Sequence, residues 1–199
     1  MVASAAERAE QASELRKEAY DFLSGSGLFQ LLADNFGQPT VTGSASYNLM
    51  VWRDIDIHMA VEADRWEEWM AFGHTLANHF AQIGMPLHEA TYLNDWVDPH
   101  PLGAGLYWGL KFKDNKGDAW KIDLWGWDPF DFAVRQARDD SLKVDLNTCD
   151  RDLILKLKND ARARDNYYGV RVTSFDIYQF AIARAGDSLS ALELWKMKQ

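Results

Sequence analysis

Apolar residues recur with two different spacings along the chain, and the spacing separates predicted helices from predicted strands. Spacings of three and four residues, which place apolar side chains on one side of a helix, predict helices in the first half over 3–24, 28–36, 45–50 and 64–84. Alternation of apolar and polar residues predicts strands over 39–43 and 54–61. The run SGSG separates the first two helices, and Asp64 is a natural N-cap for the fourth.

The second half opens with a hairpin and then becomes helical. After a loop rich in Pro, His and Asp (94–103), the runs LYWGLKFK and AWKIDLWGW flank the turn DNKGD. Beyond Pro129 the pattern predicts helices over about 131–139, 150–165, 174–186 and 188–198. We therefore expect an α/β (α+β) protein, with a core and N-terminal helices over 1–128 and a helical C-terminal region over 129–199 packed on that core.

Composition narrows the class of protein. The chain has 199 residues, of which 47% are hydrophobic, and this is enough for one domain with a sizeable core. It has no apolar run of 18 residues, its first residues lack the apolar core of a signal peptide, and Cys149 is its one cysteine. These features predict a cytoplasmic protein with no membrane span, no disulfide framework and no site built from several thiolates.

The charge of the chain bears on its partners. The net charge is −9, from 30 acidic and 21 basic residues, which disfavours binding to long nucleic acids because their affinity depends on neutralising phosphates. This charge does not exclude a nucleotide held through metal ions, and it favours small cationic substrates. Eight of the nine tryptophans lie between Trp52 and Trp127, and we expect most of them to pack in the core or at its rim.

The strand predicted over 54–61, DIDIHMAV, carries two acidic residues on one face. Alternation places Asp54, Asp56 and His58 on that face, and the isoleucines between them on the other. Carboxylates placed in this way lie about 7 Å apart along a strand, and they repel unless a cation lies between them or one keeps its proton. Asp123, in WKIDLWGW, also projects from a strand with an apolar opposite face. If the two strands pair, three carboxylates meet on one surface of the sheet.

Hard divalent cations would resolve that repulsion. A site made only of oxygen ligands suits Mg²⁺ or Mn²⁺, and Mg²⁺ commonly binds a few carboxylates together with substrate phosphates. Gly43 lets the backbone approach a ligand closely, Ser44 adds a hydroxyl donor, and the helix that follows offers free N–H groups to a phosphate. The carboxylates could thus bind the cations, and the Gly-Ser turn could bind a phosphate held by those cations.

A strand into Gly-Ser, a short helix, Asp-hydrophobic-Asp and a later strand with a lone aspartate together resemble the polymerase-beta-type nucleotidyltransferase superfamily, over about residues 38–127. The resemblance implies that Asp54 and Asp56 bind the metal ions. It also implies that Asp123 helps to bind them and orients the acceptor hydroxyl, while Gly43 and Ser44 hold the β- and γ-phosphates of an NTP.

The segment LKLKNDARARDNYYG is similar to the C-terminal helix of small bacterial nucleotidyltransferases of the antibiotic-modifying and toxin types. That similarity implies that Lys158 contacts the triphosphate. Lys156 is a competing assignment, because two residues along a helix point to different sides. Arg162 and Arg164 are further cationic candidates.

The function implied is that of a metal-dependent nucleotidyltransferase, which moves a nucleoside monophosphate from an NTP to an acceptor hydroxyl and releases pyrophosphate. The acidic balance favours a small-molecule acceptor over RNA. Two alternatives remain open: a non-catalytic nucleotide-binding or toxin-type module on the same scaffold, and a metal-dependent phosphodiesterase that uses His58.

Each candidate residue also has a purely structural interpretation. Asp54 and Asp56 could lie on a solvated strand face, and Asp123 could simply pair with Lys121. Lys158 and the two arginines after it could form the solvent face of an amphipathic helix. A buried structural role is the expectation for Cys149.

Overall fold

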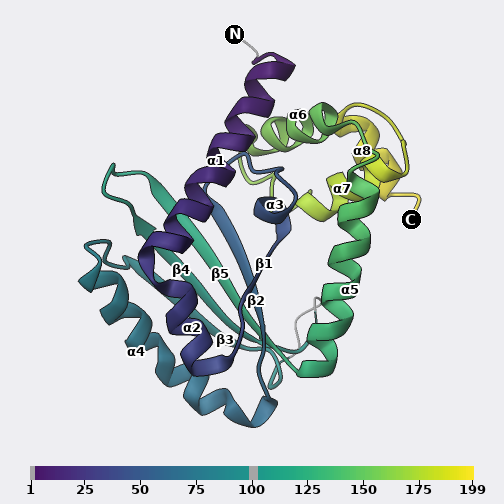
Figure 1. Cartoon of the computed structure of the whole chain (residues 1–199). Coiled ribbons are helices and arrows are strands. Elements are labelled where there is room, and N and C mark those ends of the chain that lie inside the picture. Colours follow the sequence, from purple (N-terminus) through teal and green to yellow (C-terminus); the bar gives the residue numbers. More distant parts are fainter. Residues whose placement is uncertain (1–2, 99–102) are drawn as a thin grey trace.

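A five-stranded sheet forms the centre of the computed structural model, which describes residues 3–98 and 103–199 (Figure 1). The strand order is β1-β2-β5-β4-β3. The strands are β1 (Thr40–Thr42), β2 (Asp54–Ala60), β3 (Glu89–Asn94), β4 (Leu106–Lys113) and β5 (Ala119–Trp127). β2 and β5 are parallel, whereas the other neighbouring pairs are antiparallel. The predicted fold class, a small mixed sheet flanked by helices, is confirmed.

The helices are α1 (Ala5–Ser26), α2 (Leu28–Phe36), α3 (Gly43–Ser46), the 3₁₀ helix η1 (Ala63–Arg65), α4 (Trp66–Gln82), α5 (Pro129–Leu146), α6 (Arg151–Arg162), α7 (Ser174–Ile182) and α8 (Leu189–Lys196). Helices α1, α2 and α4 pack on one face of the sheet. Helix α5 stands beside the sheet and leads to α6, α7 and α8, which gather near α3 (Figure 1). No helix in the described part of the chain is both long and apolar enough to cross a membrane.

The main core lies between the sheet and these three helices. Burial alternates strictly along β2, so that Ile55, Ile57 and Met59 are fully buried against the helices. Ile122 and Leu124 of β5 are buried on the same side. Each such side chain contributes about 1.5–3 kcal/mol of burial free energy, and a register shift by one residue would forfeit all of it. This packing holds the acidic residues of both strands on the opposite face.

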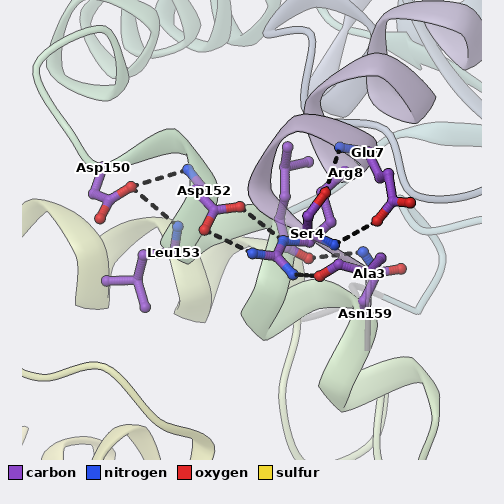
Figure 2. Close-up of polar contacts among 9 residues, drawn as sticks. Ala3, Ser4, Glu7, Arg8, Asp150, Asp152, Leu153 and Asn159 are labelled. Carbon is purple, nitrogen blue, oxygen red and sulfur yellow. Dashed lines mark hydrogen bonds and ion pairs between the residues drawn. The ribbon is translucent and has the colours of Figure 1, made fainter. Parts of the chain in front are cut away.

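A second apolar cluster joins the two ends of the chain. It contains Ala12 of α1 and Leu49 and Val51 of the segment after α3, together with residues of α5 to α8. Arg8 of α1 forms a bidentate ion pair with Asp152 of α6, with both N···O distances at 2.7 Å (Figure 2). The C-terminal helices therefore pack on the N-terminal helix as well as on the sheet side of the molecule, and the boundary at residues 128 and 129 stays a prediction.

Several local predictions were wrong. Strand β3 was not predicted, because its residues are mostly exposed and neither of its faces is continuously apolar. Asp64 lies in η1 instead of capping α4, whose N-cap is Arg65. Helix α5 continues to Leu146, beyond the predicted end at about 139, and α3 begins at Gly43 and is shorter than expected. Within the predicted loop 94–103, residues 99–102 lie outside the described residues.

Candidate active site

The three aspartates singled out in the sequence lie on two adjacent parallel strands. In the register between β2 and β5, Asp56 is the partner of Asp123, and Asp54 is the partner of Lys121. Because side chains alternate along a strand, all four project from the face that the helices α1, α2 and α4 leave uncovered. The sheet thus brings the carboxylates side by side.

Lys121 already compensates part of their charge. Its ammonium Nζ lies 2.5 Å from Oδ2 of Asp123 and 3.9 Å from Oδ1 of Asp54. The structural interpretation of Asp123, an ion pair with Lys121, is therefore present in the molecule. It coexists with the grouping of the three acids.

Tyr107 of β4 holds the other oxygen of Asp123. The Tyr107 hydroxyl donates to Asp123 Oδ1 at 2.6 Å, and burial together with the Asp123 charge raises the pKa of the phenol. Gly109, the register partner of Asp123 on β4, leaves room for this contact, because a Cβ there would overlap the Tyr107 hydroxyl. The sequence analysis missed Tyr107. The sequence feature that could have indicated it is the Tyr-x-Gly spacing of Tyr107 and Gly109. This spacing can be interpreted only when the register between β4 and β5 is known.

Asp54 accepts a hydrogen bond at only one of its two oxygens in the described structure. The indole Nε1 of Trp52 donates to its Oδ2 at 3.1 Å, whereas Oδ1 is buried without a hydrogen-bond partner among the described residues. Burial raises the pKa of Asp54, and Lys121 opposes that shift. A buried carboxylate oxygen without a partner is costly, and an added cation would satisfy it.

Asp56 is the most perturbed of the three acids. Burial, followed by repulsion from Asp54 and Asp123, raises its pKa well above the ordinary value. With only the protein's own groups around it, Asp56 therefore holds its proton to higher pH than an ordinary aspartate does. A divalent cation beside these carboxylates would oppose that shift.

Gly43 brings the backbone of α3 against Asp56. It has φ +62°, and a Cβ at this position would overlap the Asp56 carboxylate. Ser44 follows it in α3, which has four residues. The Tyr47 hydroxyl, just after α3, donates to Asp139 of α5 and so ties this turn to the side of the sheet. The predicted proximity of the Gly-Ser turn to the acids is thus a feature of the structure.

Lys158 has a different environment from the one predicted. It is fully buried, so the solvent-face interpretation is wrong for this residue. Its Nζ donates to Leu49 O at 2.7 Å and to the Tyr178 hydroxyl at 3.2 Å, and it lies 5.2 Å from the centre of the Trp52 ring. Burial lowers the pKa of Lys158 to about 7, while the charges of Asp54 and Asp56 act in the opposite direction. Contact with a triphosphate stays a prediction.

The two arginines after Lys158 are exposed and stack on different rings. The Arg162 guanidinium lies 4.6 Å from the centre of the Trp52 ring, and Arg164 lies 4.9 Å from that of Tyr167. The pKa of Arg162 is lowered by burial, and the charge of Asp54 opposes this shift. Because Trp52 also holds Asp54, Arg162 is the exposed cation that borders the acidic group.

His58 and Cys149 do not extend the site. His58 packs edge-on against Trp127, with ring centres 5.7 Å apart, and burial lowers its pKa to about 4. Cys149 is half-buried and its Sγ donates to the Asp145 carbonyl. These contacts are with other groups than the three carboxylates, although His58 shares the strand face of Asp56.

The donor set fits a hard cation by its chemistry. It consists of carboxylate oxygens, one of them buried without a partner, and it lacks the soft ligands that other metals require. As they stand, however, no group of three or more His, Cys, Asp or Glu side chains within residues 3–98 and 103–199 is arranged to hold a metal ion. The Lys121 ammonium instead forms ion pairs with two of the acids, Asp54 and Asp123.

No protein-family model matches the sequence, and no curated protein matches it either. Among solved structures, the chain is similar to the Cid1 poly(U) polymerase with MgGTP bound, at 14% identity and a TM-score of 0.51, covering 88% of this chain and 55% of that one. It is also similar to Cid1 in complex with the UTP analog UMPNPP, at 13% identity and a TM-score of 0.49, covering 83% of this chain and 47% of that one.

A third similar structure is a cytoplasmic RNA terminal U-transferase, at 13% identity and a TM-score of 0.42, covering 85% of this chain and 51% of that one. The chain therefore spans about half the length of these proteins. At such identities the likeness concerns the fold alone, and it rests on the match at a TM-score of 0.51. The resemblance stated from the sequence is confirmed at that level: the chain has the nucleotidyltransferase fold.

Proposed function

We propose, from this nucleotidyltransferase fold, that the protein transfers a nucleoside monophosphate from an NTP to an acceptor hydroxyl in a metal-dependent reaction that releases pyrophosphate. One observation carries the proposal. Asp54, Asp56 and Asp123 stand together on two parallel strands, and the Gly43 backbone lies against Asp56. Three buried or half-buried carboxylates beside a glycine turn suit a phosphate bound through cations far better than they suit a purely structural role.

Asp54 and Asp56 would hold Mg²⁺ or Mn²⁺, with Asp123 completing the ligand set. The metal would supply charge neutralisation for the triphosphate and a more acidic acceptor hydroxyl. Burial, and after it repulsion among the acids, raises the pKa of Asp54 and Asp56, and a bound ion would be favoured by the relief of that repulsion.

The remaining residues would position the reactants. Asp123 would orient the acceptor hydroxyl, since Tyr107 fixes one of its oxygens. Gly43 and Ser44 would bring backbone and hydroxyl donors to the β- and γ-phosphates. Arg162, exposed on Trp52, would attract the triphosphate to the acidic group. Catalysis of this type depends mainly on positioning and on compensation of charge.

A small, hydroxyl-bearing molecule is the acceptor that the net charge of −9 favours. One observation supports RNA as a second candidate. A pocket of about 300 Å³ opens behind α3, and Arg16, Lys143 and Arg151 from three different helices line it. Arg16 and Arg151 donate to the backbone carbonyls of Ala45 and Asn48, and the residues that line the pocket include no acid. Such a pocket suits the phosphate of an oligonucleotide.

Titration with each NTP, with and without Mg²⁺, tests the proposal on wild type and Asp56→Asn. Binding that requires Mg²⁺ and is lost in the variant supports the site. Absence of NTP binding under every condition rejects it. Binding without pyrophosphate release, across small hydroxyl compounds and short RNAs, would select the non-catalytic nucleotide-binding module. Cleavage of a phosphodiester without NTP would select the phosphodiesterase.

The two acceptor classes are separated by one further comparison. Pyrophosphate release is measured with a short RNA and with a panel of aminoglycoside-like compounds, in wild type and in Arg151→Gln. Dependence on RNA that weakens in this variant would select RNA. Release with a small compound that is insensitive to Arg151→Gln would select the small acceptor.

A further inference from the structure

The environment of Lys121 suggests a role beyond a surface ion pair. Its Nζ lies within 2.5 Å of Asp123 and 3.9 Å of Asp54, two acids on different strands, and Asp54 Oδ1 has no hydrogen bond of its own in the described residues. An ammonium between two carboxylates does electrostatically what a bound cation would do. The structure therefore contains an internal cation at the place where the acids need one.

We propose that the Lys121 ammonium stands in for a divalent ion in the free protein, and that Lys121 and the metal compete for Asp54 and Asp123. The inference rests on the proposed function, since it presupposes that these acids bind metal. It accounts for both observations made above: the acids are grouped, yet as they stand they are not arranged to hold a metal ion. Removal of the ammonium would leave their oxygens free for the ion.

Lys121 is able to leave. Its side chain is 39% exposed, and lysine combines a compact charge with a flexible stem that has several rotatable bonds. Asp54 and Asp123, by contrast, are only 19% and 12% exposed. The ammonium can thus move into water while the carboxylates stay on their strands.

The sheet offers a matched control in Lys111. It is the register partner of Lys121 on β4 and is exposed to a similar extent, but its Nζ pairs with Glu89 of β3 at 2.7 Å. Across the four strands, Asp54, Lys121, Lys111 and Glu89 therefore form one row. The two lysines differ mainly in which acids they contact.

Competition makes a defined prediction for metal binding without nucleotide. Mn²⁺ is titrated calorimetrically into wild type, Lys121→Met and Lys111→Met at constant ionic strength. We expect Lys121→Met to bind Mn²⁺ about tenfold more tightly than wild type, because a positive charge at ion-pair distance from two ligands is removed. Lys111→Met should change the affinity less than about twofold, since its charge is farther from the site and screened by solvent.

Thermal unfolding supplies the second readout. In EDTA we expect Lys121→Met to unfold at a lower temperature than wild type, because the carboxylates lose their internal counter-charge. Saturating Mn²⁺ should abolish this difference or reverse it. Lys121→Gln repeats both measurements with a side chain that keeps hydrogen-bonding capacity, in case the methionine variant folds poorly.

The outcomes separate the inference from the proposal on which it rests. Mn²⁺ binding of equal strength in wild type, Lys121→Met and Lys121→Gln would overturn the competition while leaving the metal site intact. An equal gain in Mn²⁺ affinity in Lys111→Met would show that any loss of positive surface charge has this effect. That result would also overturn the competition between Lys121 and the metal. If none of these proteins binds Mn²⁺, the metal site falls, and the inference falls with it.

Discussion

Asp56 of β2 and Asp123 of β5 are register partners across the one parallel strand pair of the described sheet. Their residue numbers differ by 67, so the parallel pairing alone makes them neighbours. Burial fixes this pairing, because the isoleucines next to Asp56 and the apolar neighbours of Asp123 face the same core. The core beneath the sheet thus fixes the positions of the two acids relative to each other.

Removal of the Asp56 charge should separate activity from stability. We expect Asp56→Asn to reduce nucleotidyl transfer by at least about 10²-fold, in line with the loss of other charge-stabilising groups in active sites. In EDTA its free energy of unfolding at pH 7 should equal or exceed that of wild type, because a buried repulsion is removed. Initial rates of pyrophosphate release and urea unfolding measure the two effects. Asp140→Asn, an exposed acid on α5, is the control and should change neither.

The raised pKa of Asp56 also gives this comparison a pH dependence. The folded protein holds the Asp56 proton to higher pH than the unfolded chain, so this residue lowers stability as pH rises above 3.8, the ordinary pKa of an aspartate. The advantage of Asp56→Asn over wild type in EDTA should therefore grow between about pH 4 and pH 7. An advantage that shrinks over this range would contradict the assignment.

Gly43→Ala should be costly for two reasons. The position has φ +62°, where a side chain costs about 1–2 kcal/mol, and a Cβ there would also overlap the Asp56 carboxylate. Gly27→Ala is the matched control, with φ +72° and a Cβ at an ordinary 3.6 Å from the His79 ring. We expect both variants to lose stability by chemical unfolding, and only Gly43→Ala to lose metal-dependent NTP binding. Equal NTP binding in the two variants would remove Gly43 from the site.

Lys158 should make stability depend on pH. Burial lowers its pKa from 10.5 to about 7, so from pH 7 to about pH 10 the unfolded chain holds a proton that the folded protein has lost. The free energy of unfolding should therefore rise with pH in this window, by up to about 1.4 kcal/mol per unit from this group, and the cost of burying the charge should be fully present below pH 7.

Urea unfolding of wild type and Lys158→Met between pH 6.5 and pH 9.5 measures that contribution. The methionine variant should lack the rise, whatever its stability at any one pH. Lys156→Met, a lysine two positions earlier on the same helix, should keep the wild-type slope. Identical slopes in all three proteins would mean that Lys158 keeps its proton in the fold.

Arg162 should act on NTP binding more than on the chemical step. Arg162→Ala removes the exposed cation that stacks on Trp52 beside Asp54, and we expect the KM for NTP to rise about tenfold with a smaller change in kcat. Arg164→Ala, which removes the same charge from the Tyr167 ring, should change KM less than about twofold. Steady-state rates against NTP concentration give both constants, and equal effects of the two substitutions would point to general electrostatic attraction.

The parts of the fold that could be predicted from sequence are those with strong alternation. β2, β4 and β5 have a nearly continuous buried face, which identified the strands and the direction of Asp54, Asp56 and Asp123. β3 lies at the sheet edge with little burial, so its sequence carries no such signal. Helix α5 has one buried residue, Leu146, at its very end, so the residues from about 139 onward read as a polar segment in the sequence.

Site residues could be predicted where their spacing within one strand reveals them. They could not be predicted where their role depends on tertiary contacts. The acids could be found because their spacing is local. Tyr107 reaches Asp123 only because Gly109 stands across from that residue, and this requires the strand register. Lys158 looked like a surface lysine because a helical charge pattern does not reveal that Leu49, Trp52 and Tyr178 enclose the ammonium.

The two basic residues that α6 directs at the turn after α3 have a mechanical consequence. Arg151 and Lys158 are seven positions apart, about two helical turns, and they hold the carbonyls of the consecutive residues Asn48 and Leu49. Hydrogen bonds from these two residues connect helix α6 to the segment that lies between Ser44 and Asp54. A displacement of the C-terminal helices would therefore move the segment after the glycine turn with it.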